Sequence, residues 1–358
     1  KVAYTTIDDP SAYFQTKKYT GNATDDTAYT NDGNSDLQPD LIWAKNRDVA
    51  VDHVWFDSTR GVTKNVRSNN PDVESTNSNY LKSFDSDGFT MGTSNRVNGN
   101  TNDMVAWQWK ANGGTATHSQ SESGSNIACS VQANTTAGFS IITYTGTGTS
   151  GHTFLHGLGS APTWFIVKGR SIGGSWRNYH HKMASDPETD SIKLDETGAK
   201  ADVAGHWNDT APTSSVFSIG DDDNTNNDGN LYICYAWKEI QGYSKFGGYE
   251  GNNDSDGPFL YTGFQPAFFM VKNVDSTSAW RLYSNKISNQ NGFNDVDRHL
   301  YPNSSEEEGG GGHVVDFVSN GIKIRGDNED VNDANTYIYM AFAEHPFVSS
   351  KGVPCTAR

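Results

Sequence analysis

The chain has 358 residues, of which 27 are Lys or Arg and 43 are Asp or Glu, so its formal net charge is −16. This charge argues against nucleic acid or an anionic membrane surface as the main partner. The hydrophobic fraction is only 34%, but 9 Trp, 16 Tyr and 17 Phe are too many aromatic residues for a disordered chain. No run of residues is long and apolar enough for a membrane span, so we expect a folded protein without membrane insertion.

The first residue and the cysteines bear on where the protein is made. The sequence begins at Lys1 rather than Met, which leaves open a removed or longer amino-terminal segment. Cys129, Cys234 and Cys355 lie far apart and form no CxxC motif. They predict free thiols rather than a disulfide framework or a zinc site, and synthesis in a reducing cytoplasm is the simplest interpretation.

Short aromatic and β-branched runs, bounded by Gly, Asn, Asp or Pro, predict strands along the whole chain. Clear examples are residues 40–45, 140–144 and 267–272. We find no long amphipathic helical pattern between such runs, and 36 Gly and 11 Pro punctuate the chain. The sequence therefore predicts an all-β fold built from antiparallel β-sandwiches.

Five landmarks recur three times in the same order: a Tyr-x-Gly strand, a Pro-led apolar strand ending in lysine, a Trp strand, a Phe strand and a final aromatic strand. Their clearest members are, copy by copy, Lys45, Lys168 and Lys272; Trp55, Trp176 and Trp280; and Trp109, Trp237 and Phe342. A fixed order of landmarks at a period above 100 residues indicates a repeated structural unit. We predict three tandem β-sandwich repeats, covering residues 1–122, 123–243 and 244–358.

The three copies differ most in polar loops at residues 63–78, 183–212 and 288–312. Because no core face constrains such loops, we expect the two longest to lie exposed and to cluster at one rim of the molecule. Residues 113–124 are rich in Gly, Ser and Thr and predict a flexible linker between the first two copies.

An acidic loop precedes the last strand of the second copy, at residues 221–229. Its Asp221, Asp223 and Asp228 supply the oxygen ligands that Ca²⁺ prefers, although their spacing is not that of an EF-hand. Asp and Asn also dominate tight turns, because they hydrogen-bond their own backbone. A turn is the favoured interpretation, Ca²⁺ is the alternative, and no other cofactor is expected.

Catalytic motifs are missing from the sequence. It contains no Gly-x-Ser-x-Gly elbow, no His-Glu-x-x-His and no P-loop. His152, His156, His180 and His181 have no counterparts in the other copies and are interpreted as solvated or turn residues. A glycosidase needs only two placed carboxylates, which 43 acidic residues neither support nor exclude. We expect a protein that is not an enzyme.

Aromatic residues allow two interpretations. Rings that recur in all three copies are predicted to form the core, whereas unrepeated rings beside the variable loops, including Trp164, are candidates for stacking on sugar rings. Asp and Asn side chains nearby would hold sugar hydroxyls. The residues predicted for such a glycan site are Trp207, Asn208, Asp209, Tyr301 and Asn303.

Several stretches of the sequence are distinctive. They are residues 55–61 (WFDSTRG), 87–89 (DGF), 242–247 (GYSKFG), 256–259 (DGPF), 337–344 (YIYMAFAE) and 346–358. Together they resemble a module of structural proteins from marine tailed bacteriophages, over nearly the whole chain. The resemblance implies jelly-roll or concanavalin-like sandwiches in a virion protein of the tail-fibre, appendage or capsid-decoration type, with no catalytic residues.

The function expected from these observations is that of a non-enzymatic virion protein on the particle exterior, assembled in the host cytoplasm. Other virion proteins, further copies of the chain and host-surface glycans are the expected partners. Nucleic acid and membrane insertion are not expected. The alternative is a secreted lectin or carbohydrate-active enzyme with accessory sandwich modules, which gene neighbours such as a portal or capsid gene would distinguish.

Overall fold

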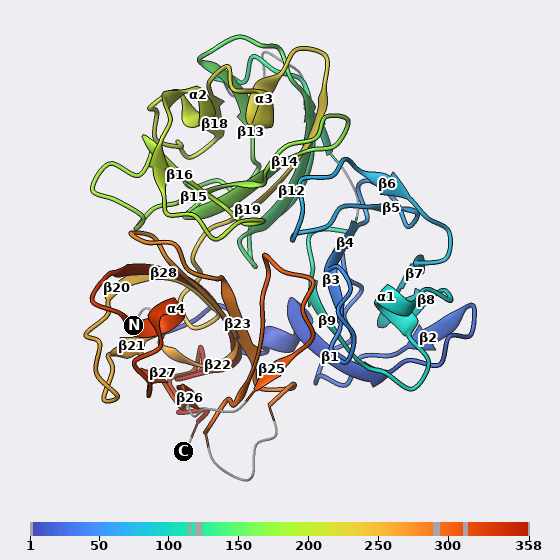
Figure 1. Cartoon of the computed structure of the whole chain (residues 1–358), viewed down its shortest axis with the longest axis vertical. Helices are drawn as coiled ribbons and strands as arrows, with labels where there is room; N and C mark the ends of the chain where they lie inside the picture. The colour runs from blue at the N-terminus through green and yellow to red at the C-terminus, as the bar shows by residue number, and fades with distance from the viewer. Residues whose placement is uncertain (1–2, 114–115, 119–123, 289–293, 311–313, 357–358) are drawn as a thin grey trace.

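The computed structural model describes residues 3–113, 116–118, 124–288, 294–310 and 314–356. The chain forms three lobes around a common centre (Figure 1). We call them the first, second and third lobe, and they contain strands β1–β9, β10–β19 and β20–β28, respectively. Each lobe contains a larger and a smaller antiparallel sheet, so the predicted all-β fold is confirmed.

The first lobe pairs its strands in the orders β1-β9-β3-β4 and β2-β8-β7, with β5 and β6 as a separate pair. Its elements are η1 (Pro10–Ala12), β1 (Phe14–Thr20), β2 (Thr27–Tyr29), β3 (Leu41–Asn46), β4 (Val54–Asp57), β5 (Lys64–Asn65), β6 (Ser75–Thr76), β7 (Leu81–Asp85), β8 (Gly88–Met91), α1 (Asn95–Asn98) and β9 (Asp103–Trp109).

The second lobe pairs its strands in the orders β10-β11-β12-β19-β14-β15-β16-β17 and β13-β18. Its elements are β10 (Ala116–His118), β11 (Cys129–Asn134), β12 (Phe139–Thr145), β13 (His152–Leu155), β14 (Trp164–Gly169), β15 (Arg177–His180), β16 (Asp190–Lys193), β17 (Ala201–Asp202), α2 (Ala204–Trp207), β18 (Val216–Ile219), α3 (Asp223–Asn226) and β19 (Leu231–Trp237). Strand β10 lies in the segment expected as a linker. Residues 114–115 and 119–123 of that segment are outside the described residues.

The third lobe pairs its strands in the orders β20-β28-β22-β23-β24-β25 and β21-β27-β26. Its elements are β20 (Ser244–Glu250), β21 (Phe259–Tyr261), β22 (Phe264–Asn273), β23 (Arg281–Ser284), β24 (Arg298–Leu300), β25 (Gly309–Gly310), β26 (Val315–Val318), β27 (Gly321–Ile324), α4 (Glu329–Asn332) and β28 (Thr336–Pro346). The helices among the described residues are single turns, and none is long and apolar enough to cross a membrane.

Four strands in each larger sheet follow one pairing order: β1-β9-β3-β4, β12-β19-β14-β15 and β20-β28-β22-β23. Trp109, Trp237 and Phe342 hold the same place in this order. Their pairing partners are Phe14 and Leu41, Phe139 and Trp164, and Ser244 and Phe268, respectively. The division of the chain at 122/123 and 243/244 stays a prediction.

The expected equivalence of Trp55, Trp176 and Trp280 is wrong by two residues. Trp55 lies within β4, opposite Trp43. Trp176 and Trp280 directly precede β15 and β23, which is the place that His53 holds before β4. Side chains two residues apart on a strand point to the same face, so rings from either position reach the same core.

The centre of the molecule is one hydrophobic cluster to which all three lobes contribute. Aromatic rings meet across each boundary between lobes, which we call a seam. The ring centroids are 5.2 Å apart for Trp55 and Trp176, 6.0 Å for Trp164 and Trp280, and 4.9 Å for Phe14 and Phe342. Each lobe also has one hydrophobic cluster of its own, which fills the space between its two sheets. The lobes therefore share the core that dominates their stability.

Candidate functional site

Trp207, predicted to be an exposed stacking ring, is buried. It ends α2, is 1% exposed and packs 4.8 Å from the ring of Phe165. Its indole Nε1 donates a hydrogen bond to the Asp190 carbonyl at 2.9 Å. The expectation of an exposed ring is therefore wrong: α2 carries Trp207 into the core between the sheets of the second lobe.

In the turn that follows α2, Asn208 is half-buried and Asp209 is exposed. Both have positive φ values, 55° and 44°, which suits residues that end a helix. The Asn208 side chain accepts a hydrogen bond from Ser150 Oγ at 2.8 Å. With the Trp207 ring buried, these two side chains have no stacking platform beside them.

Tyr301 and Asn303 belong to the third lobe, whereas Trp207 belongs to the second. The Arg281 guanidinium lies 4.5 Å from the centroid of the Tyr301 ring, and its Nη1 donates to the Tyr301 hydroxyl at 2.9 Å. Asn303 Oδ1 accepts a hydrogen bond from the main-chain N–H of Trp280 at 2.9 Å. One face of the ring and the amide oxygen are thus used within the protein.

The acidic loop forms a helical turn. Asp222 caps α3 by accepting a hydrogen bond from the N–H of Asn224 at 2.8 Å, and hydrogen bonds from His206 and Asn224 lower the pKa of its carboxyl group. The predicted calcium ligands Asp221, Asp223 and Asp228 are exposed and are not gathered into one site. Across the described ranges, no three His, Cys, Asp or Glu side chains are placed to hold a metal ion.

The variable loops contact neighbouring lobes. The loop of the first lobe lies against the second, where the carbonyls of Arg67 and Pro71 accept hydrogen bonds from Trp176 Nε1 at 2.8 Å and Lys168 Nζ at 3.1 Å. The loop of the second lobe offers the Lys193 carbonyl to Trp280 Nε1 at 2.8 Å.

The third lobe closes the cycle onto the first. The Ser305 carbonyl accepts from Lys45 Nζ at 3.3 Å, and the Glu308 N–H donates to the Arg47 carbonyl at 2.8 Å. Residues 183–212 also contain β16, β17 and α2, so the expectation of a wholly exposed loop there is wrong. Residues 289–293 and 311–312 of the third loop lie outside the described residues.

Lys45, Lys168 and Lys272 share one buried environment. Each is 0% exposed, and each Nζ donates to the carbonyl of the residue that follows it. Burial lowers the pKa of each ammonium group from 10.5 to about 8. A lysine with such a pKa is a potential nucleophile, but the carbonyls around Nζ make these three structural. Sequence reasoning found the lysines as landmarks and missed their burial.

Charged groups also connect the first and second lobes. The fully buried Arg60 pairs with Asp57 and Glu74, and Tyr235 of the second lobe donates to Asp57 Oδ2 at 2.7 Å. Arg170, also of the second lobe, donates to Glu74 at 2.8 Å. Burial alone would raise the pKa of Glu74, but the hydrogen bond from Arg170 and the charge of Arg60 lower it. Glu74 is therefore held as an anion at the seam.

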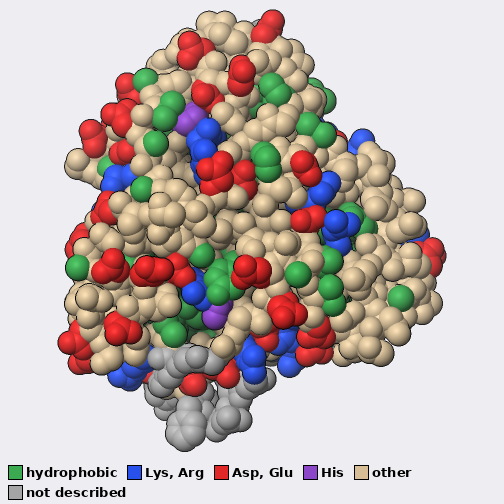
Figure 2. Space-filling model, viewed as in Figure 1, with side chains coloured by type: hydrophobic (Ala, Val, Ile, Leu, Met, Phe, Trp, Pro, Cys, Tyr) green, Lys and Arg blue, Asp and Glu red, His purple; other side chains and the backbone are tan. Residues whose placement is uncertain are grey.

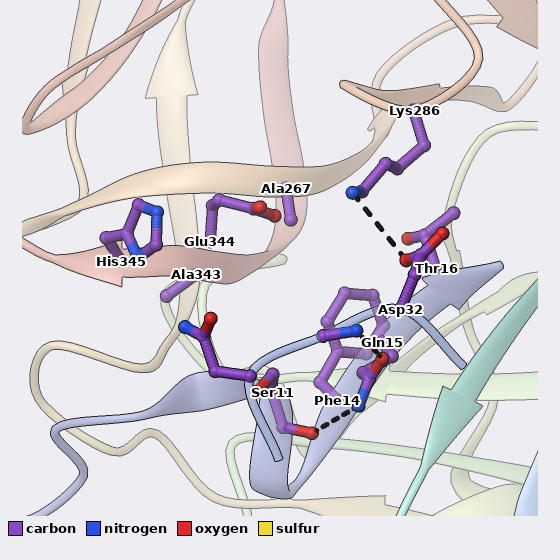
Figure 3. A pocket seen from close by; sticks show the side chains of 12 residues that line it. Ser11, Phe14, Gln15, Thr16, Asp32, Ala267, Lys286, Ala343, Glu344 and His345 are labelled. Atoms are coloured by element: carbon purple, nitrogen blue, oxygen red, sulfur yellow. Dashed lines mark hydrogen bonds and ion pairs between the residues drawn. The ribbon is translucent and has the colours of Figure 1, made fainter. Parts of the chain in front are cut away.

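A pocket of about 200 Å³ opens at the seam between the first and third lobes (Figure 3). We call it the seam pocket. Phe14, Ala267 and Ala343 supply its apolar lining. The side chains of Lys286 and Asp32 approach each other at one end, and Glu344 lies on the strand across from them (Figure 3).

The two carboxylates that line the seam pocket contact neighbouring side chains. Asp32 lies 3.4 Å from Lys17 Nζ and 3.8 Å from Lys286 Nζ, and Glu344 accepts from Asn285 Nδ2 at 3.0 Å. Thr16 Oγ1 is buried and has no hydrogen-bond partner among the described residues.

Comparison with protein-family models matches residues 9–346 to one family, described as a domain of unknown function (DUF7483). A search of curated proteins gave no match. A search of solved structures gave none either. The matched range runs from η1 to the end of β28 and so includes all three lobes. The chain therefore belongs to the DUF7483 family.

Proposed function

We propose that the protein is a non-enzymatic structural component of a phage particle, displayed on the exterior, where it contacts host-surface glycans. The observation that carries this proposal is the shared aromatic core, with loops that fasten each lobe to the next. Such a body resists deformation and suits a rigid spacer or adhesion platform. The resemblance of residues 55–61 and 337–344 to phage virion modules supports the same assignment.

The surface charge supports an exterior position. The net charge is −16, and Asp and Glu side chains are spread over all three lobes on the face shown in Figure 2. A surface of this sign repels the DNA inside a particle. It is compatible with exposure to solvent and with contact to uncharged or locally complementary partners.

The seam pocket supports binding over catalysis. A glycosidase needs two carboxyl groups free to act as acid and base or nucleophile. In this pocket Asp32 is paired with lysines and Glu344 is bound to Asn285. The alternative is a secreted lectin or carbohydrate-active enzyme, and these contacts speak against the enzyme half of that alternative.

Particles of the phage that carries the gene provide the test. Mass spectrometry of purified virions is expected to detect the protein in stoichiometric amount, and cryo-electron microscopy is expected to place a three-lobed density on the outer surface. A mutant particle that lacks the tail or the appendages is the control, because it shows whether the protein's position on the virion depends on those parts. Absence of the protein from purified virions would contradict the proposal.

A further inference from the structure

Two exposed aromatic rings set one edge of the third lobe apart. Among the described residues only five large apolar side chains are exposed, and of these only Phe259 (48%) and Tyr261 (54%) are aromatic. All nine Trp are at most 1% exposed. Phe259 and Tyr261 are two residues apart on β21, so they share a face, while Leu260 between them is buried. Two exposed aromatic side chains on one strand, on a molecule whose other described Phe, Tyr and Trp rings are buried or half-buried, indicate a binding surface.

A groove of about 440 Å³ lies beside these rings, which we call the edge groove. It runs between β20 and β21, which are edge strands of the two sheets of the third lobe. Two consecutive glycines of β20 keep it open. A Cβ on Gly247 would come within 2.4 Å of the Tyr339 ring, and a Cβ on Gly248 would lie 3.1 Å from the Lys182 Cβ. Larger residues would fill the groove or displace its wall.

The two rings are held in place before any ligand arrives. The Tyr261 hydroxyl lies 3.1 Å from the Tyr4 hydroxyl, which itself donates to the Gly263 carbonyl at 2.9 Å. The Phe259 ring covers Gly321, where a Cβ would come within 2.7 Å of a ring carbon. A platform fixed in this way loses little conformational entropy on binding, which favours affinity.

The edge groove also carries an unneutralised cation. Lys182 is exposed and has no ion pair within the described part of the chain, whereas Lys245, on the same groove, is paired with Glu239 at 2.7 Å. Glu250 also lines the groove, so the charges there are mixed, and the ammonium of Lys182 is the lining cation that pairs with no described carboxylate. It offers a partner for a negatively charged group on a ligand that stacks on those rings.

We propose that the edge groove binds an acidic saccharide. A pyranose ring stacks on Tyr261 and Phe259, and its carboxylate pairs with Lys182. This assignment rests on the proposed function, because it names the site and the class of the glycan. A peptide strand is disfavoured as occupant, because His181 Nε2 already donates to the Phe246 carbonyl at 2.6 Å and interrupts the free edge of β20.

Binding of oligogalacturonate, with neutral oligoglucose as the uncharged probe, tests the assignment on the full chain by calorimetry. Wild-type protein is expected to bind oligogalacturonate. Tyr261→Ala and Phe259→Ala are each expected to lower the affinity about tenfold or more. Tyr261→Phe keeps the ring and is expected to bind nearly as well as the wild type. Lys182→Met is expected to weaken binding of the acidic probe and to reduce its dependence on salt.

Leu231→Ala is the matched control, because Leu231 is an exposed apolar residue of the second lobe. It is expected to leave binding unchanged, and circular dichroism of each variant verifies folding. No sugar binding by the wild type, or binding that Tyr261→Ala and Phe259→Ala leave intact, overturns the proposal. Equal affinity for oligoglucose overturns the acidic specificity. If purified virions contain the protein but it binds neither probe, this inference fails while the assignment as a virion component stands. If the protein binds oligogalacturonate but is absent from virions, the proposed function fails and the edge groove stands.

Discussion

Single aromatic rings of this protein take part in two lobes at once. Trp237, at the end of β19, stacks on Phe139 of its own sheet with ring centroids 5.1 Å apart. Its ring also meets Trp109 of the first lobe edge to face, at 6.3 Å. It is 1% exposed. Removing such a ring deletes packing both within a sheet and across a seam. The loss in the free energy of unfolding should therefore exceed the smallest losses that core truncations cause.

Replacing Trp237 by Ala is expected to lower the free energy of unfolding by about 3–5 kcal/mol. The substitution leaves a cavity in the central cluster, and the sheets of all three lobes around it prevent the cavity from collapsing. Equilibrium unfolding in urea measures the change. Trp237→Phe is the matched variant and is expected to lose less, since an aromatic ring remains and the unpartnered indole Nε1 is removed. A loss below about 1 kcal/mol for Trp237→Ala would contradict the assigned packing.

The buried lysines predict a pH dependence of stability. Burial lowers the pKa of Lys168 to about 8, whereas the unfolded chain keeps the ordinary value of 10.5. Between these values the unfolded state binds more protons, so the free energy of unfolding rises with pH. The stabilisation is complete above about pH 10.5, decreases as the pH falls from about 10.5 to about 8, and is lost below about 8.

Lys168→Met is expected to flatten this rise by up to a few kcal/mol, at about 1.4 kcal/mol per pKa unit. Urea unfolding at several pH values between 8 and 10 measures the slope. The slope is the informative quantity, because the substitution also leaves the Pro71, Gly169 and Gly174 carbonyls without their donor. Lys18→Met, at an exposed position, is expected to keep the wild-type slope. An unchanged slope in Lys168→Met would show that the ammonium is solvated.

At the scale of elements, the single helical turns α1, α3 and α4 fasten the two sheets of each lobe. Each ends on a fully buried asparagine. Its Nδ2 donates to a glycine carbonyl, and its Oδ1 accepts from a main-chain N–H that lies just beyond β1, β12 or β20. The sets are Asn98 with Gly92 and Asn22, Asn226 with Gly220 and Thr147, and Asn332 with Gly326 and Asn252. A tyrosine hydroxyl meets the residue before each asparagine, in the pairs Tyr19 and Val97, Tyr144 and Thr225, and Tyr249 and Val331.

Asn226→Ala is expected to destabilise the protein by about 1–3 kcal/mol, because the Thr147 N–H and the Gly220 carbonyl lose their partner in a buried place. Thermal and urea unfolding measure the change. Asn100→Ala, in an exposed turn, is expected to stay within about 0.5 kcal/mol of the wild type. Equal stability of the two variants would mean that water replaces the Asn226 side chain at no cost.

The strands were largely predictable from the sequence, and the candidate site was not. The predicted runs at 40–45, 140–144 and 267–272 correspond to β3, β12 and β22, because β-branched and aromatic runs between turn residues are a local signal. Burial of Trp207 depends on how α2 packs against Phe165, which no local pattern reports. Exposure of Phe259 and Tyr261 depends on which face of the smaller sheet is left uncovered, which only the packing of the two sheets reveals.

At the scale of the whole molecule, the three lobes form a closed cycle in which each has two neighbours (Figure 1). Residues of all three lobes line the central cluster, so no lobe can leave without exposing aromatic surface of the other two. The amino-terminal segment adds a further tie, because Thr5 Oγ1 donates to the Gln241 carbonyl at 2.8 Å, next to the third lobe.

This closure predicts one cooperative unfolding transition instead of three. Differential scanning calorimetry is expected to show a single peak, with tryptophan fluorescence and far-ultraviolet circular dichroism reporting the same midpoint. Trp55→Ala, which removes a ring at the seam of the first and second lobes, is expected to lower that midpoint and keep the single transition. Separate transitions in the wild type would contradict the role given to the central cluster.

The fastening of each lobe to the next relies on carbonyl groups of the loops, at Arg67, Pro71, Lys193 and Ser305. Every amino acid presents the same carbonyl, so these acceptors do not depend on which side chains the loops carry. Apart from seam carboxylates such as Glu74 and Glu308, side chains along the loops are free to change, while an insertion or deletion would move the acceptor away from its lysine or tryptophan. Selection on these loops should therefore preserve their path and length near the acceptors and leave the identity of their outward residues unconstrained.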